Sequence, residues 1–324
     1  MASSLLIETL SSVVAAASPL VFAGIGETIT EKVGIVNLSL DGSIMLSAMT
    51  GFALASLSGS VLVGILGAMV VGALIALIIA VSNISLRQDQ VAVGFVLTLL
   101  CADLSSFIGR PFVSIPGPSM AHMPVPGLAQ IPLLGPVLFD HDMLVYLSYA
   151  AIILTWVWLN TTQAGLKLRA VGERPEAAFA RGINVNRSRY LYTMLGGALV
   201  GLAGATYSLS VKLGWSYRHT AGFGWIALAI VIFGGWSPIR VALGAYLFGL
   251  LNSLASIMQP SFQNIPTQVF QTAPFALMIL ALLIVSGDLI ERLPLYLPGK
   301  FGRRLQMIFQ GKPPAGLGKR FQSD

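Results

Sequence analysis

Charged residues are scarce in this chain of 324 residues. Asp, Glu, Lys and Arg together make up 10% of it, whereas hydrophobic residues make up 55%. A soluble domain carries about a quarter of its residues as charges. Because so few charges cannot cover a globular surface in water, lipid is the expected solvent. The predicted fold class is an all-α polytopic transmembrane helical bundle.

Cysteine and histidine are also rare. The single cysteine, Cys101, lies in an apolar run, which excludes an internal disulfide and predicts a small buried side chain. The three histidines, His122, His141 and His219, fall in predicted loops without the spacing of metal ligands. No nucleophile and base are paired in the sequence either. The composition therefore argues against an enzyme and against a metal site.

Motifs that would power transport are missing as well. The sequence contains no GxxxxGK[ST] loop, so this chain is not expected to bind ATP in the usual way. At membrane depth we count only Asp41 and Asp103 as carboxylates, too few for a proton relay. The energy source is therefore another subunit, or the protein is a passive pore.

Long apolar runs are what the sequence does contain. About 20 apolar residues cross the hydrocarbon of a bilayer, and the runs predict about nine spans, within a range of 8–10. They lie near residues 5–25, 35–57, 61–82, 91–110, 143–160, 189–210, 223–236, 240–259 and 270–289. The N-terminal run lacks a basic segment and continues too long for a signal peptide, so it is interpreted as the first span.

Basic residues gather in two places. Residues 160–190 hold six basic and two acidic side chains, and residues 290–324 hold seven basic and two acidic ones. The positive-inside rule places both regions in the cytoplasm, and four predicted spans separate them, as this requires. The transmembrane domain is then residues 1–290, with a cytoplasmic loop at 161–188 and a basic cytoplasmic tail at 291–324. The N-terminus falls outside. Both basic regions adjoin spans, so nucleic acid is not an expected partner.

A proline-dense segment, residues 111–142, falls on the external side. Proline fixes φ and removes a hydrogen-bond donor, so we expect no regular helix there. A loop of this length is usually functional or packed on something. The segment is interpreted as a lid over the bundle or as a plain connector.

Glycines recur at helical spacing within the spans. Gly197 and Gly201 lie four residues apart, and Gly64, Gly67 and Gly72 form a second series. Small residues at such spacing let helix backbones approach closely in lipid. The pattern predicts packed helices and indicates nothing about substrate.

Polar residues interrupt the second predicted span. Asn37, Ser39 and Asp41 lie between Gly34 and Gly42, which favours a broken second helix. Such a break is tolerated where the backbone lines protein or water. The polar group is either a structural hinge or a substrate contact. Further candidates for the substrate pathway, for each of which an interhelical hydrogen bond is the alternative, are Asp103, Asn252 and Ser253.

Three segments resemble the permease subunits of ATP-binding-cassette importers for branched-chain amino acids, simple sugars and nucleosides. The first, residues 26–48, is similar to the nucleoside and simple-sugar branch at Glu31, Gly34, Ile35, Asn37 and Gly42, with Ser39 and Asp41 where that branch has Gly and Glu. The second matches at Leu166, Arg169, Ala170, Val171, Gly172, Pro175, Ala177, Ala178, Gly182 and Ile183. The third is GFGWIALAIVIFGGWSPIRVALGAYLFGLLNSL, residues 222–254.

The resemblance implies several partners. They are a second permease subunit, different or identical, a cytoplasmic ATPase, an extracytoplasmic substrate-binding protein and membrane lipid. This chain binds no cofactor of its own, because ATP and Mg²⁺ belong to the ATPase. The implied location is a bacterial inner membrane. The resemblance further implies a coupling helix that docks on the ATPase, at about Glu173 to Arg181.

The physical chemistry of this stretch agrees with a docking helix. Pro175 suits a first helical turn, and Glu173 and Glu176 lie where the helix dipole favours negative charge, opposite Arg181. Gly182 suits the position just past a helix end. The expected coupling residues are Glu173, Arg174, Pro175, Glu176, Ala177, Ala178, Phe179, Arg181 and Gly182. Phe179, the one large apolar side chain among them, either contacts the ATPase or packs beneath its own bundle.

Nucleosides or simple sugars are the expected cargo, because neutral, hydroxyl-rich molecules suit a path with few charges. Branched-chain amino acids are the alternative within the family. A zwitterion needs a cation or a helix N-terminus at its carboxylate, and the spans offer no strong basic candidate. A secondary transporter or channel is the alternative outside the family. It would leave residues 171–183 without a partner.

Overall fold

The computed structural model describes residues 2–262 and 311–321, together with 266, 268–270, 272, 273, 275, 276, 279 and 280. Its helices are α1 (Ala2–Lys32), α2 (Leu40–Ser58), α3 (Val61–Ala80), α4 (Gln90–Ile108), α5 (Leu134–Leu138), α6 (Met143–Thr161), α7 (Gln163–Glu173), α8 (Pro175–Ala180), α9 (Val185–Thr206), α10 (Phe223–Phe233) and α11 (Pro238–Met258). Short π-helical turns, Val81–Ser85 and Tyr207–Val211, extend α3 and α9. Within the described part of the chain the β-structure is limited to two isolated bridges, so the all-α prediction is confirmed.

Seven of the described helices are long and apolar enough to cross a membrane: α1, α2, α3, α4, α6, α9 and α11. The predicted span 223–236 is the short helix α10, and the last predicted span, 270–289, falls largely outside the described residues. Large apolar side chains are exposed along the outer faces of α3 and α4, for example Leu66, Leu74, Leu99 and Phe107. Such a surface suits lipid.

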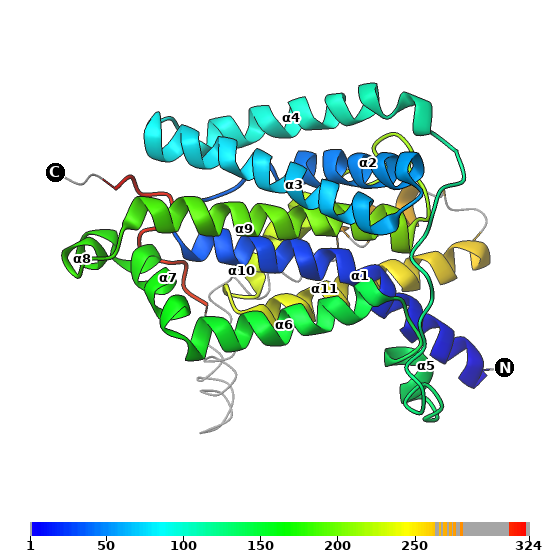
Figure 1. Cartoon of the computed structure of the whole chain (residues 1–324). Helices are drawn as coiled ribbons and strands as arrows, with labels where there is room; N and C mark the ends of the chain where they lie inside the picture. The colour runs from blue at the N-terminus through cyan, green and yellow to red at the C-terminus, as the bar shows by residue number, and fades with distance from the viewer. Residues whose placement is uncertain are drawn as a thin grey trace, which may run out of the picture.

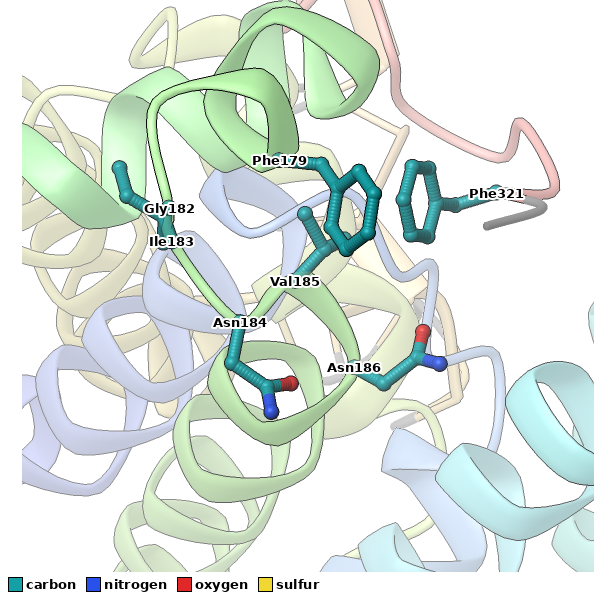
Figure 2. Close-up of a pocket in the computed structure, with 7 residues that line it drawn as sticks. All are labelled: Phe179, Gly182, Ile183, Asn184, Val185, Asn186 and Phe321. Atoms are coloured by element: carbon teal, nitrogen blue, oxygen red, sulfur yellow. The ribbon is translucent and has the colours of Figure 1, made fainter. Parts of the chain in front are cut away.

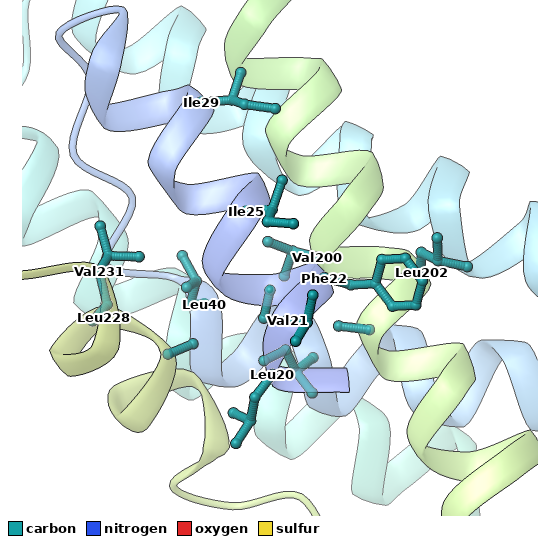
Figure 3. Close-up of a cluster of buried hydrophobic side chains, with 14 of the residues drawn as sticks. Leu20, Val21, Phe22, Ile25, Ile29, Leu40, Val200, Leu202, Leu228 and Val231 are labelled. Atoms are coloured by element: carbon teal, nitrogen blue, oxygen red, sulfur yellow. The ribbon is translucent and has the colours of Figure 1, made fainter. Parts of the chain in front are cut away.

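Helix α1 lies at the centre of the bundle. It packs against α9, α11, α10 and α6 (Figure 1). Figure 3 shows its side chains Leu20, Phe22 and Ile25 next to those of α9 and α10, and all three are fully buried. A helix with neighbours on several sides is expected to bury apolar side chains on each of those sides.

The predicted close approach of helices at glycines is confirmed at the α3–α9 contact. A Cβ atom added to Gly72 would lie 2.2 Å from the carbonyl oxygen of Gly197, and one added to Gly201 would lie 2.2 Å from that of Ala68. Gly64 approaches the Gly51 carbonyl of α2 at 2.4 Å in the same sense. Alanine at these positions would force the backbones apart.

The break at the second span lies before α2 instead of within it. Residues 33–39 are not helical, whereas α2 is continuous from Leu40 to Ser58. Gly34 has φ of 99°, a left-handed conformation that glycine adopts without steric cost. The polar segment is therefore a buried turn between two helices.

The proline-rich segment crosses one end of the bundle. Met120 donates its backbone N–H to the Leu209 carbonyl at 2.9 Å, and a Cβ atom on Gly117 would lie 2.5 Å from the ring of Phe52. The segment contains the short helix α5, so the expectation that no regular helix forms there is wrong. α5 lies near the N-terminus, and α7, α8 and residues 311–321 lie at the opposite end (Figure 1).

Candidate functional site

The predicted coupling helix is shorter than expected. Glu173 is the last residue of α7, Arg174 is extended with φ of −145° and ψ of 84°, and α8 begins at Pro175. The residue before a proline avoids the helical conformation, because the proline ring would clash with its backbone. Arg174 is therefore a joint that turns α8 away from α7, and Glu173 does not belong to the docking helix.

The C-terminal end of α8 is closed by backbone hydrogen bonds. Gly182 has φ of 81°, its N–H donates to the Phe179 carbonyl at 2.8 Å, and the Ile183 N–H donates to the Ala178 carbonyl at 3.1 Å. This pair of bonds is a Schellman motif, which needs a left-handed residue and so favours glycine. Gly182 ends α8 as the sequence predicts, and six residues remain as a rigid unit.

One face of α8 is turned outward. Pro175 and Ala178 are buried, whereas Glu176 and Ala177 are exposed. The Phe179 side chain is 48% exposed, and its ring centroid lies 5.6 Å from that of Phe321 in the C-terminal tail. Phe179 is therefore not tucked under its own bundle.

A pocket of about 480 Å³ lies beside this aromatic pair (Figure 2). It is lined by Phe179, Gly182, Ile183, Asn184, Val185, Asn186 and Phe321. The pocket combines two aromatic rings with the turn that joins α8 to α9. It is thus a surface where a side chain of another molecule could insert.

The polar segment before α2 is bonded within the chain. The Asn37 N–H donates to Glu27 Oε1 at 3.1 Å, and Asn37 Oδ1 accepts from the Ser39 N–H at 3.1 Å. An Asn that accepts from the backbone two residues later forms an Asx turn. Asn37 and Ser39, which are both fully buried, thus hold the turn.

Asp41 caps a different helix from its own. Its Oδ1 accepts from the backbone N–H of Gly222 at 2.8 Å and from that of Gly224 at 2.9 Å. These donors belong to the first turn of α10, whose own N-cap, Gly222, has no side chain to offer. The carboxylate therefore joins α2 to the start of α10.

Two buried carboxylates, Glu27 and Glu31, were missed as intramembrane groups by the reasoning from sequence. They lie one turn apart on α1, and Glu31 accepts a hydrogen bond from the indole N–H of Trp236. Asp103, which was expected at depth, is exposed and lies 3.4 Å from Arg218. The spacing of the two glutamates, four residues apart and directly after the apolar run 5–25, was the signal that could have found the pair.

The remaining candidates lie elsewhere. Ser253 Oγ is 3.1 Å from Ser12 Oγ of α1, and Asn252 next to it is half-buried. Ser12 and Glu27 are separated by about 22 Å along α1, at 1.5 Å per residue. The structure therefore does not bring Asn252 and Ser253 together with the polar segment before α2.

A comparison with known protein families shows which family this chain belongs to. Residues 9–283 match the family described as the branched-chain amino acid transport system / permease component. The chain belongs to this family. It is a multi-pass membrane permease subunit, and ATP hydrolysis belongs to a separate subunit.

Relatives with full-length similarity carry sugar and nucleoside names. The chain is 37% identical to a putative glucose ABC transporter permease protein, TsgC13, of Haloferax volcanii over 82% of this chain and 81% of that one. It is 35% identical to the nucleoside ABC transporter permease protein NupC of Lactococcus lactis, over 84% and 90%. It is 35% identical to the guanosine ABC transporter permease protein NupQ of Bacillus subtilis, over 82% and 88%.

A second permease protein from each of two of these organisms also matches this permease in part. NupB of L. lactis is 29% identical over 41% of this chain, and NupP of B. subtilis is 27% identical over 39%. Related permease subunits thus occur as pairs. No solved structure matches the chain.

Proposed function

We propose that this permease forms half of the translocation path of an importer for nucleosides or simple sugars. We further propose that α8 docks on the ATPase and transmits the conformational change driven by ATP hydrolysis to the bundle. The observation that carries the docking role is the geometry of α8. It is a short helix with a fixed start and end, and it presents a half-exposed aromatic side chain at one end of a membrane bundle. An exposed aromatic of this kind is a typical interface anchor.

The proposed cargo rests on two supports. The relatives with full-length similarity are named for glucose, nucleosides and guanosine. In addition, the buried polar groups Asn37, Ser39 and Asp41 are already bonded within the chain, and Arg189, the buried cation beside Gly34, donates to the Lys319 carbonyl of the tail. Neutral molecules bound by hydroxyl and amide groups suit such a path.

Uptake by cells that carry the complete transporter tests the cargo. Radiolabelled guanosine, glucose and leucine are supplied separately, and the same cells without the permease gene are the control. We expect uptake of guanosine or glucose to depend on the permease. Uptake of leucine alone would instead identify a branched-chain amino acid importer.

The proposed orientation follows from the basic charge at the α8 end. That end faces the cytoplasm of a bacterial cell with the inner membrane around the bundle, and the N-terminus lies outside. The loop at 111–142 then faces the extracytoplasmic binding protein, and a second permease, in the manner of the paired relatives, completes the path. Protease access to a cleavage site inserted near Gly127 tests this orientation, because that glycine lies in an open turn.

Two substitutions test the docking role of α8. Phe179→Ala removes the anchor, and Glu176→Lys reverses an exposed charge on the same helix. We expect each variant to fold and to lose ATPase binding or the coupling of hydrolysis to uptake. Glu8→Lys, an exposed glutamate at the opposite end, is the matched control. Unchanged ATPase binding and uptake in both α8 variants would contradict the proposal.

The buried carboxylates of α1 raise one competing function, proton-coupled transport. Glu27 accepts from the Asn37 backbone and Glu31 accepts from Trp236, so Glu27 joins α1 to the turn before α2 and Glu31 joins α1 to the segment after α10. We expect deletion of the ATPase gene to abolish uptake. Uptake that survives the deletion would favour a secondary transporter.

A further inference from the structure

The C-terminal tail, residues 311–321, is fixed to the α8 end of the bundle (Figure 1). The Gly316 N–H donates to the Gly172 carbonyl of α7 at 2.8 Å, and the Gly318 N–H donates to the Gly34 carbonyl at 3.1 Å. The Ala315 N–H donates to a Glu173 carboxylate oxygen at 3.1 Å. These hydrogen bonds fix the position of the tail against the coupling loop and against the turn before α2.

The close approach at Gly316 explains why the tail follows this course. A Cβ atom added there would lie 2.7 Å from the Gly172 carbonyl oxygen and 3.2 Å from Pro175 Cδ. The tail therefore lies directly against the joint where α7 ends and α8 begins. Any larger residue at 316 would push the tail away from this joint.

Arg189 of α9 holds the last part of the tail. It is among the largest fully buried side chains, and its Nη1 donates to the Lys319 carbonyl at 3.1 Å. Burial of a guanidinium is costly unless acceptors are provided. Among the described residues, Nε and Nη2 of Arg189 have no hydrogen-bond partner, so the tail carbonyl is a principal acceptor for this buried charge.

The fixed tail brings Phe321 to Phe179. The two rings are tilted by 58° at 5.6 Å between centroids, and both line the pocket of about 480 Å³ (Figure 2). The aromatic surface beside α8 is therefore composite, because the coupling loop supplies one ring and a segment more than 130 residues later supplies the other.

The charge around this pocket indicates the kind of partner that fits. The exposed basic side chains on the coupling loop, the start of α9 and residues 315–321 are Lys167, Arg174, Arg181, Arg187, Lys319 and Arg320. The exposed acidic side chains there are Glu173 and Glu176, of which Glu173 already accepts from the tail. A partner that complements this surface has an apolar side chain ringed by acidic residues.

We propose that residues 315–321 form part of the docking surface for the ATPase, with Phe321 and Phe179 as a joint anchor for an apolar side chain surrounded by acidic residues on the ATPase. This inference rests on the proposed function of α8. Arg189 is a positioning residue, because it holds the tail in place and does not itself reach the partner. The coupling surface is then incomplete without the end of the chain.

Binding of the purified ATPase to the full-length permease in lipid nanodiscs tests the proposal. Phe321→Ala is compared with Phe179→Ala, and Lys312→Ala is the control, because Lys312 is exposed in the same tail and does not line the pocket. We expect both phenylalanine variants to raise the Kd about tenfold, which corresponds to about 1.4 kcal/mol. Lys312→Ala should leave the Kd within about twofold of wild type.

A second measurement keeps the aromatic ring and so avoids the risk of misfolding. A photoreactive phenylalanine analogue is placed at position 321, or at 312 as the control, in the assembled transporter. We expect the analogue at 321 to cross-link to the ATPase, and the one at 312 to cross-link far less. Arg189→Lys should lower the cross-linking at 321, since a lysine donates from a single nitrogen.

The outcomes separate this inference from the function on which it rests. Phe179→Ala could weaken ATPase binding while Phe321→Ala leaves the Kd unchanged and the analogue at 321 does not cross-link to the ATPase. In that case the tail is not part of the docking surface, and the docking role of α8 stands. A cross-link from 321 to a second copy of this chain or to lipid likewise overturns the inference. If neither phenylalanine matters, the proposed docking by α8 fails as well.

Discussion

The contact of Asp41 with α10 gives a prediction whose size can be worked from the structure. Asp41 Oδ1 is the acceptor for two backbone donors, the N–H groups of Gly222 and Gly224. Asp41→Ala leaves both without this acceptor. A buried donor without a partner costs about 1–3 kcal/mol. Gly224 is buried and Gly222 is half-buried, so we expect a total loss of about 3 kcal/mol in the free energy of unfolding.

Asp41→Asn separates the charge from the hydrogen bonds. The amide oxygen can still accept from Gly222 and Gly224, and only the extra strength of a charged acceptor is lost. We therefore expect a loss of about 1 kcal/mol. Asp103→Ala is the control, because that carboxylate is exposed on α4, and its effect should stay within about 0.5 kcal/mol.

The measurement is the unfolding of purified variants in detergent, followed by tryptophan fluorescence, alongside uptake by cells. If Asp41 is a structural cap, stability and uptake should fall together in the order wild type, Asn, Ala. An alanine variant that is as stable as wild type but has lost uptake would refute this reasoning. Asp41 would then be a substrate contact.

Three further predictions concern the α8 end of the bundle and the loop between α9 and α10. Gly172→Ala should prevent normal packing of α7 on α1 and lower the yield of folded protein, because the added Cβ would lie 1.9 Å from the Lys32 carbonyl oxygen; size-exclusion chromatography measures this. Gly182→Ala should lower the free energy of unfolding by about 1 kcal/mol, because alanine is strained at φ of 81°. A denaturant titration measures this loss, and Ala177→Gly in the same titration tests the separate effect of helix propensity in α8. Burial lowers the pKa of His219 below its ordinary value. Stability should therefore be constant above about pH 6.5 and fall below it as the unfolded state takes up the proton; His219→Gln should flatten this part of the profile, and an unchanged slope would contradict the assignment.

The span pattern could be predicted from the sequence because lipid imposes it. About 20 apolar residues are needed to cross the hydrocarbon, and the predicted spans at 143–160 and 240–259 match α6 and α11 within about two residues at each end. The end of α8 was predictable for a local reason, since a left-handed residue at Gly182 favours glycine. Its start was placed too early, because the sequence does not show that Arg174 would separate α7 from α8.

The polar candidates show where local reasoning fails. Asp103 lies within a predicted span and Glu31 lies between two of them, yet Asp103 is exposed and Glu31 is buried. The difference depends on which face of each helix its neighbours cover, and that is decided by the packing of α1 at the centre of the bundle.

Composition alone determined that this chain is a membrane bundle, since a chain with 10% charged residues cannot be solvated by water over its whole surface. The order of its motifs determined the family. Only the tertiary structure decided that Asp41 caps α10 and that the C-terminal tail meets α8. These contacts join residues 181 and 142 positions apart, and no local propensity or spacing encodes such a meeting.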